Sequence, residues 1–155
     1  MGKLDRFDRH ILELMQADAS LSVGDIADRV ALSKTACWRR IQKLEAAGII
    51  RGRVTLLEPS AVDLGLTVYV AIRTNQHNDA WARRFGEVLA GIPEVLEAHR
   101  MSGDLDYLVK AVVSDMSGYD RLYKQLIQAD LFDVSSSFVM ETLKETTVLP
   151  LHDTG

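Results

Sequence analysis

The sequence lacks most of the features on which several classes of protein depend. Of its 155 residues, one is cysteine, three are proline and ten are glycine. A single cysteine cannot form an internal disulfide, which excludes a disulfide-stabilised secreted scaffold and indicates the reducing cytoplasm. The low proline and glycine content excludes a collagenous or low-complexity chain. Hydrophobic residues make up 47% of the chain, enough for a real core, which excludes a disordered protein.

Long apolar runs and an excess of basic charge are also missing. No apolar stretch approaches the roughly 20 residues of a membrane-spanning helix, so no membrane partner is expected. The four histidines, at positions 10, 77, 99 and 152, show neither metal-ligand nor catalytic-triad spacing, so we expect no metal, no cofactor and no catalytic residue. The formal net charge of −4 argues, for the chain as a whole, against a nucleic-acid partner.

The charge is unevenly distributed along the chain. Residues 1–60 carry ten Lys/Arg and eight Asp/Glu, whereas residues 61–155 carry eight and fourteen. Within the first part, residues 33–53 contain six basic residues and one acidic residue, Glu45. A basic segment beside an acidic remainder is typical of a nucleic-acid-binding module attached to another domain. The alternative is a solvated helix face with no partner.

The first part of the chain predicts a helix-turn-helix. Apolar residues recur at helical spacing over about residues 5–18, and Ser22 and Asp25 form a start signal for a short second helix. Ser33 can cap a longer basic helix over about residues 33–48, with Cys37 on its apolar face as a structural rather than a redox thiol. In a helix-turn-helix the second helix of the pair enters the major groove.

The candidate DNA-binding residues lie on this third helix and just after it. Residues 49–56 predict two short strands that turn near Gly52, forming a wing that lays basic side chains along the DNA backbone. Trp38 can stack on a deoxyribose or cover the helix pair, and Arg39 and Arg40 can contact phosphate or a guanine edge. The predicted DNA-binding residues are Ser33, Lys34, Thr35, Trp38, Arg39, Arg40, Lys43, Arg51 and Arg53.

The second part of the chain predicts a ferredoxin-like fold. Turn-forming residues place a linker at about residues 59–66, between a DNA-binding domain over residues 1–58 and a second domain over residues 67–155. Alternating and helical patterns then follow in the order β-α-β-β-α-β, at residues 67–74, 79–91, 95–101, 104–113, 116–129 and 134–144. Such a sheet leaves one face open, usually for a second copy of itself. The fold class is therefore α+β.

A family resemblance is carried by residues 4–12 (LDRFDRHIL), 39–50 (RRIQKLEAAGII), 93–99 (PEVLEAH) and 103–108 (GDLDYL). Over residues 4 to about 150 the chain resembles the Lrp/AsnC ("feast/famine") transcription regulators of bacteria and archaea. The resemblance implies a winged helix-turn-helix joined to an amino-acid-sensing domain that forms homodimers, which often assemble into octamers. Residues 35–40 and 135–141 further resemble a cysteine-responsive branch.

The chain departs from the family pattern at two places. Ala31 occupies the turn of the helix-turn-helix, where the family usually has glycine. If the backbone there needs a positive φ, alanine costs about 1 kcal/mol. Residues 130–133 replace the Pro-Gly that commonly precedes the last strand, which affects the loop beside the expected effector site.

The candidate effector site follows from the chemistry of a free amino acid and from the resemblance. Two carboxylates beside the Ser102-Gly103 turn can receive an ammonium group, although the same residues also fit a plain hairpin turn. The resemblance places the response site there, at a junction between dimers. Cysteine, leucine and methionine are the candidate effectors. The predicted effector-binding residues are Met101, Gly103, Asp104, Asp106, Tyr107, Ser136 and Ser137.

Together these features predict an amino-acid-responsive transcriptional regulator in the cytoplasm, associated with the nucleoid. Its dimer symmetry predicts a roughly palindromic double-stranded operator with half-sites about 10 bp, or a multiple of that, apart. The alternative is a nucleoid-type architectural DNA-binding protein without an effector. An enzyme on the second domain is not expected, because nothing supplies partner groups for Asp104 and Asp106.

Overall fold

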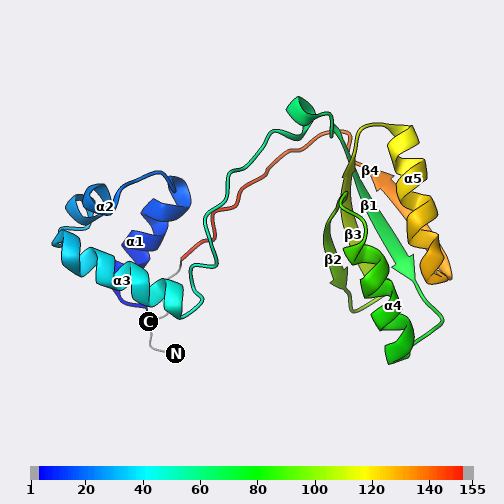
Figure 1. Cartoon of the computed structure of the whole chain (residues 1–155), viewed down its shortest axis with the longest axis horizontal. Helices are drawn as coiled ribbons and strands as arrows, with labels where there is room; N and C mark the ends of the chain where they lie inside the picture. Colours follow the sequence, from blue (N-terminus) through cyan, green and yellow to red (C-terminus); the bar gives the residue numbers. More distant parts are fainter. Residues whose placement is uncertain (1–3, 152–155) are drawn as a thin grey trace. The chain divides into compact units, whose positions relative to one another are not determined.

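The computed structural model describes residues 4–151, which form two compact units (Figure 1). The first unit contains the described residues 4–55 and 144–151, and the second is Leu56–Leu143. This division differs from the expected one at the end of the chain, because residues 144–151 pack with the first unit. Within residues 4–151, no helix is both long and apolar enough to cross a membrane.

Three helices build the first unit: α1 (Arg6–Ala17), α2 (Val23–Arg29) and α3 (Lys34–Ala46). Each begins directly after a side chain that accepts hydrogen bonds from the free N–H groups of its first turn, namely Asp5, Ser22 and Ser33. Their apolar faces meet in one core. That core includes Cys37, which has no exposed surface, and burial raises the pKa of its thiol. The interpretation of Cys37 as a structural thiol agrees with this burial.

The turn between α2 and α3 requires a left-handed backbone. Ala31 has φ 56°, the Leu32 N–H donates to the Ala27 carbonyl at 3.0 Å, and the Ala31 N–H donates to the Asp28 carbonyl at 3.4 Å. These two bonds define a Schellman motif, whose left-handed residue is usually glycine. The end of α3 has the same motif with Gly48 at φ 70°. The expectation that Ala31 occupies a glycine-type position is confirmed.

Replacing Ala31 with glycine is expected to stabilise the protein. The left-handed conformation costs alanine about 1–2 kcal/mol, and glycine avoids this cost. Glycine also has more conformational freedom in the unfolded chain, which offsets part of the stabilisation. We expect Ala31→Gly to raise the free energy of unfolding by about 0.5–1 kcal/mol, measured by urea denaturation. Gly48→Ala is the matched control and should lower it. No gain in Ala31→Gly would show that the backbone at this turn does not strain alanine.

The two short strands expected over residues 49–56 are not formed in the described chain. Residues 51–58 belong to no helix or strand. A two-residue hairpin turn needs positive φ, and Gly52 is not among the residues with positive φ. The N–H groups of Ile49 and Ile50 donate to the Leu44 carbonyl, which ties the start of this segment to the end of α3.

The C-terminal segment returns to the first unit. The Gln16 side-chain amide donates to the Leu149 carbonyl at 3.2 Å, and the Leu149 N–H donates to Gln16 Oε1 at 2.7 Å. Leu151 packs against the core formed by the three helices. Residues 144–151 therefore pack with the first unit, although the sequence pattern placed them in the second domain.

The second unit has the predicted order of elements and a single antiparallel sheet with strand order β2-β3-β1-β4. Short 3₁₀ turns, η1 (Pro59–Val62) and η2 (Ile127–Ala129), precede β1 and follow α5. The main elements are β1 (Leu66–Arg73), α4 (Asp79–Ala90), β2 (Val95–Arg100), β3 (Tyr107–Val113), α5 (Met116–Leu126) and β4 (Asp133–Phe138).

Both helices cover the same face of this sheet. Val68, Val70 and Ile72 of β1 are fully buried in one cluster with Phe85 of α4 and Leu122 of α5. Residues between them, such as Tyr69 with 38% of its surface exposed, point to the opposite face. One face of the sheet is thus covered and the other remains open in the single chain, as the sequence predicted.

The last strand is shorter than expected. The alternating pattern predicted a strand over residues 134–144, whereas β4 ends at Phe138. This strand pairs only with β1, and Phe138 lies opposite Val68, close to the first residue of β1. The Val139 N–H makes a last hydrogen bond to the Thr67 carbonyl at 2.9 Å. Beyond that point β1 offers no further partner, so the extended chain leaves the sheet.

Candidate nucleic-acid interface and ligand pocket

One face of α3 is exposed and basic. Ser33 Oγ accepts a hydrogen bond from the Ala36 N–H at 3.2 Å and starts the helix. The exposed residues that follow recur at helical spacing on the side opposite the buried stripe of Cys37, Ile41 and Leu44. The predicted DNA-binding residues on this exposed face are Lys34, Thr35, Trp38, Arg39 and Lys43.

Trp38 contributes aromatic surface to this face. Its side chain is 52% exposed, so only about half of it is covered. Large aromatic residues are usually buried in a protein of this size. The exposed half is therefore open to a partner, and stacking on a deoxyribose stays a prediction.

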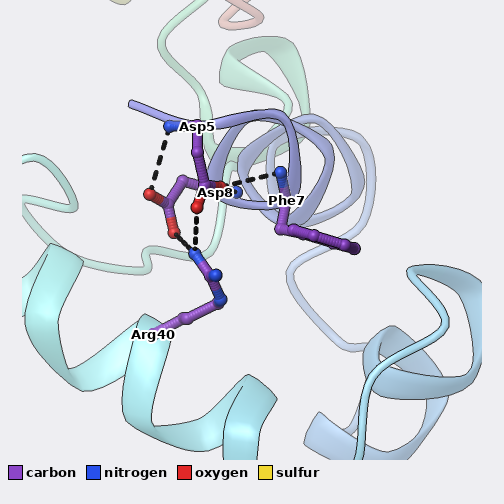
Figure 2. Close-up of polar contacts among 4 residues, drawn as sticks. All are labelled: Asp5, Phe7, Asp8 and Arg40. Carbon is purple, nitrogen blue, oxygen red and sulfur yellow. Dashed lines mark hydrogen bonds and ion pairs between the residues drawn. The ribbon is translucent and has the colours of Figure 1, made fainter. Parts of the chain in front are cut away.

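Arg40 has different surroundings from its neighbours on α3. Its Nη1 donates to Asp5 Oδ2 at 2.7 Å and to Asp8 Oδ1 at 2.8 Å, and both carboxylates belong to the beginning of α1 (Figure 2). The guanidinium carbon also lies 5.3 Å from the centroid of the Phe7 ring. Although the sequence placed Arg40 in the DNA-binding set, its side chain is directed toward α1.

The remaining cations divide into paired and unpaired groups. Arg53 Nη2 binds Glu45 Oε1 at 2.8 Å and is therefore partly neutralised. Arg51 lies exposed in the extended segment after α3. Among residues 4–151, the predicted DNA-binding cations that form no ion pair are Lys34, Arg39, Lys43 and Arg51.

In the second unit, the loop between β2 and β3 is tied to the end of β1. The Asp106 N–H donates to the Ile72 carbonyl at 3.0 Å, and Asp106 Oδ2 accepts the Thr74 N–H at 2.8 Å. Arg73 Nε donates to the Asp104 carbonyl at 2.8 Å. Gly103 has φ 110°, a conformation that requires glycine at this turn. One carboxylate oxygen of Asp106 is therefore used by the backbone, and Oδ1 makes no hydrogen bond to residues 4–151.

A cavity of about 90 Å³ lies next to this loop. Asp106 and Tyr107, two of the predicted effector residues, line it. Met101, Gly103 and Asp104 belong to the adjoining loop but do not line the cavity. The other lining residues do not belong to the predicted set; they are Thr74, Gln76, His77, Asn78, Asp79, Trp81, Ala82 and Arg100. The β-α-β-β order could have indicated them, because it brings the ends of β1 and β2 to the start of β3.

The cavity contains charges of both signs and an aromatic wall. Asp79 and Asp106 supply carboxylates, and Arg100 supplies a guanidinium that forms no ion pair within residues 4–151. Trp81 and Tyr107 also line the cavity, and the centroids of their rings lie 5.6 Å apart. A ligand that carries both an ammonium and a carboxylate group complements this arrangement.

The two predicted serines of β4 lie on opposite faces of the sheet. Ser136 pairs with Val70 and accepts a hydrogen bond from the Tyr119 hydroxyl at 2.7 Å, which places it on the face that the helices cover. Ser137 pairs with Tyr69 on the open face. Within one chain neither serine lines the cavity, and their contact with an effector stays a prediction.

The loop that replaces the family's Pro-Gly supports the same end of the sheet. Asp130 has φ 55°, a left-handed conformation that aspartate tolerates better than most residues. Its Oδ2 accepts a hydrogen bond from Gln76 Nε2 at 2.7 Å, and its carbonyl lies 3.3 Å from the Trp81 indole nitrogen. Gln76 and Trp81 both line the cavity, so this loop helps to hold its wall.

No group of three metal-ligating side chains occurs within the part of the chain that the structure describes. His152, one of the four histidines considered in the sequence, lies outside the described residues.

Comparisons with known proteins assign each unit to a family. Residues 4–51 match a winged helix-turn-helix DNA-binding family, and residues 67–149 match the Lrp/AsnC ligand-binding domain. The glutamate uptake regulatory protein of Zymomonas mobilis is 48% identical over 99% of this chain and 94% of its own length.

Two solved structures have the same fold over nearly the whole chain. An AsnC family transcriptional regulator from Agrobacterium tumefaciens has a TM-score of 0.90 and 52% identity, covering 95% of this chain and 97% of its own. A transcriptional regulator from Neisseria meningitidis, crystallised in complex with L-Met, has a TM-score of 0.89 and 33% identity, covering 96% and 97%.

Proposed function

The chain belongs to the Lrp/AsnC family of DNA-binding transcriptional regulators with an amino-acid-binding domain, and from that premise we propose that an amino acid bound by the second unit controls how the first unit binds its operator. The relatives are regulators, so the chain is not an enzyme. The observation that carries the proposal is the coexistence of an exposed, unpaired basic helix face and a cavity suited to a zwitterion.

DNA is bound by the exposed face of α3. The free N–H groups at its N-terminus, beside Ser33, Lys34 and Thr35, favour phosphate or base edges. Trp38, Arg39 and Lys43 follow on the same face, and Arg51 and Arg53 continue along the DNA backbone. Two copies in a homodimer bind a roughly palindromic operator on the nucleoid, in the cytoplasm, with half-sites about 10 bp or a multiple of that apart.

The open face of the sheet forms the dimer. Tyr69, Ala71 and Leu108 lie on this face and are only partly buried in the single chain. A second copy of the sheet would remove them from water. Dimers then assemble into an octamer, and the effector binds near the junction between dimers, where the loop that holds Met101, Gly103 and Asp104 and the strand that holds Ser136 and Ser137 contribute further contacts.

The effector is an amino acid held by its charged groups. Arg100 binds the carboxylate, Asp106 and Asp79 face the ammonium, and the aromatic wall packs against the side chain. The L-Met complex of the Neisseria relative supports methionine as a candidate beside cysteine and leucine. Effector binding shifts the assembly only by the difference in affinity between its arrangements.

A thermal-unfolding screen with the twenty amino acids tests this function. An amino acid that binds the folded protein at a hundred times its Kd should stabilise it by about 2.7 kcal/mol, seen as a higher Tm. The same compound should change binding to an operator selected from random DNA. An absence of any shift, together with unchanged DNA binding, would favour the alternative of an architectural DNA-binding protein without an effector.

A further inference from the structure

Arg39 and Arg40 are adjacent in the sequence, but the structure places them in opposite environments. Arg39 is exposed and forms no ion pair within residues 4–151. The Arg40 side chain is 30% exposed, and its guanidinium lies between Asp5 and Asp8 (Figure 2). A phosphate would have to compete with two carboxylates already in hydrogen-bond contact with Arg40, and the three side chains together carry a net negative charge.

The same two carboxylates also start α1. Asp5 Oδ1 accepts the N–H groups of Phe7 at 2.8 Å and Asp8 at 2.9 Å, and Asp8 Oδ2 accepts the Asp5 N–H at 3.4 Å. Asp5 Oδ2 and Asp8 Oδ1 remain, and both bind Arg40. Each carboxylate therefore divides its two oxygens between the N-terminus of α1 and the middle of α3.

This division makes Arg40 sensitive to the orientation of α3. Turning α3 about its axis, or sliding it along α1, would move Arg40 away from both carboxylates at once. The Phe7 ring limits the guanidinium further, at 5.3 Å from its centroid. Because side chains on a helix are separated by about 100° per residue, the angle at which Arg40 is held also sets the direction of Arg39.

We propose that Arg40 is a positioning residue that does not contact DNA, and that its bonds to Asp5 and Asp8 set the orientation in which α3 presents Lys34, Trp38 and Arg39 to the operator. The inference rests on the proposed function, since it requires that α3 bind DNA. It replaces the sequence-based interpretation of Arg40 as a direct contact.

The test compares Arg40→Ala with Arg39→Ala in the full-length protein. For each, binding to a selected operator and to random-sequence DNA is measured from 50 to 200 mM NaCl, at a temperature where circular dichroism shows the variant fully folded. We expect Arg40→Ala to lower the ratio of operator affinity to random-DNA affinity by about tenfold, which is comparable to the loss caused by one mismatched base pair. The salt slope should not change. Arg39→Ala should reduce the salt slope.

A second variant breaks the contact from the α1 side and preserves the fold. Asn is as good an N-cap as Asp. Asp5→Asn therefore keeps the bonds to Phe7 and Asp8 and loses the charged acceptor of Arg40. It should lower the affinity ratio in the same way, and the effect of Asp5→Asn combined with Arg40→Ala should be less than the product of the two.

Three results would overturn the proposal. A reduced salt slope in Arg40→Ala, equal to that of Arg39→Ala, would make Arg40 a phosphate contact. An unchanged affinity ratio in folded Arg40→Ala and Asp5→Asn would show that the contact between Arg40 and the α1 carboxylates has no effect on DNA recognition. An unsubstituted protein that binds no DNA would overturn the proposed function together with this inference, whereas the first two results leave DNA binding intact.

Discussion

Replacing Arg39 with alanine is expected to weaken operator binding and to flatten its dependence on salt. Arg39 is exposed on the basic face of α3 and has no carboxylate partner among residues 4–151. A cation that neutralises a phosphate contributes about −0.9 to the slope of log K against log salt concentration. A dimer loses two such contacts, so we expect the slope to become shallower by about 1.8.

The affinity loss depends on what Arg39 contacts. If Arg39 binds a guanine edge, each half-site loses about 1–3 kcal/mol of discrimination, and the loss falls on the operator but not on random DNA. If it binds phosphate, both DNAs lose affinity equally. Fluorescence anisotropy with both DNAs over a range of salt concentrations separates the two contacts.

Arg83→Ala is the matched control for this experiment. Arg83 is exposed on α4 of the second unit, so the variant loses the same charge outside the proposed interface. Its affinity and salt slope should equal those of the unsubstituted protein. If Arg39→Ala also leaves both unchanged, Arg39 does not belong to the interface.

Removing the charges that face the cavity is expected to abolish the amino-acid response. Arg100→Gln removes the guanidinium, and Asp106→Asn removes a negative charge but keeps an oxygen that can accept the Thr74 N–H. A hydrogen bond to a charged group contributes about 1.5–3 kcal/mol, so each variant should weaken amino-acid binding by roughly 10- to 100-fold. DNA binding without the amino acid should not change.

Isothermal titration calorimetry with the amino acid found in the thermal screen measures this loss. Glu87→Gln provides the control, because Glu87 is exposed on α4 but does not line the cavity. It should bind the amino acid as the unsubstituted protein does. Titrations of Arg100→Gln and Asp106→Asn that match the parent would place the effector site elsewhere in the second unit.

The elements that could be predicted are those whose signals are local. Asp5, Ser22 and Ser33 begin helices because a short polar side chain satisfies N–H groups within three residues along the chain. The β-α-β-β-α-β order follows from side-chain periodicity in the same way. The strain at Ala31 was also predictable, because it depends only on the backbone of one turn.

The predictions that failed concern pairing across the chain. Residues 49–56 and 139–144 have the composition of strands, but a strand needs a partner with free N–H and C=O groups. Gly52 does not make the turn that would supply one, and β4 leaves the sheet next to the first residues of β1. A period-2 pattern alone does not contain this information.

The helices, the fold class and the family can be recognised from the amino-acid sequence, because caps, periodicity and motif spacing act over a few residues. Which charges remain available depends on how distant segments pack together. Arg39 and Arg40 are equivalent in the sequence. Arg40 has two carboxylate partners only because α3 packs beside the beginning of α1, more than thirty positions earlier in the chain. The cavity likewise exists only because the ends of three strands and the beginning of α4 meet. Charge neutralisation and ligand binding depend on distances in space, and contacts between distant residues set those distances.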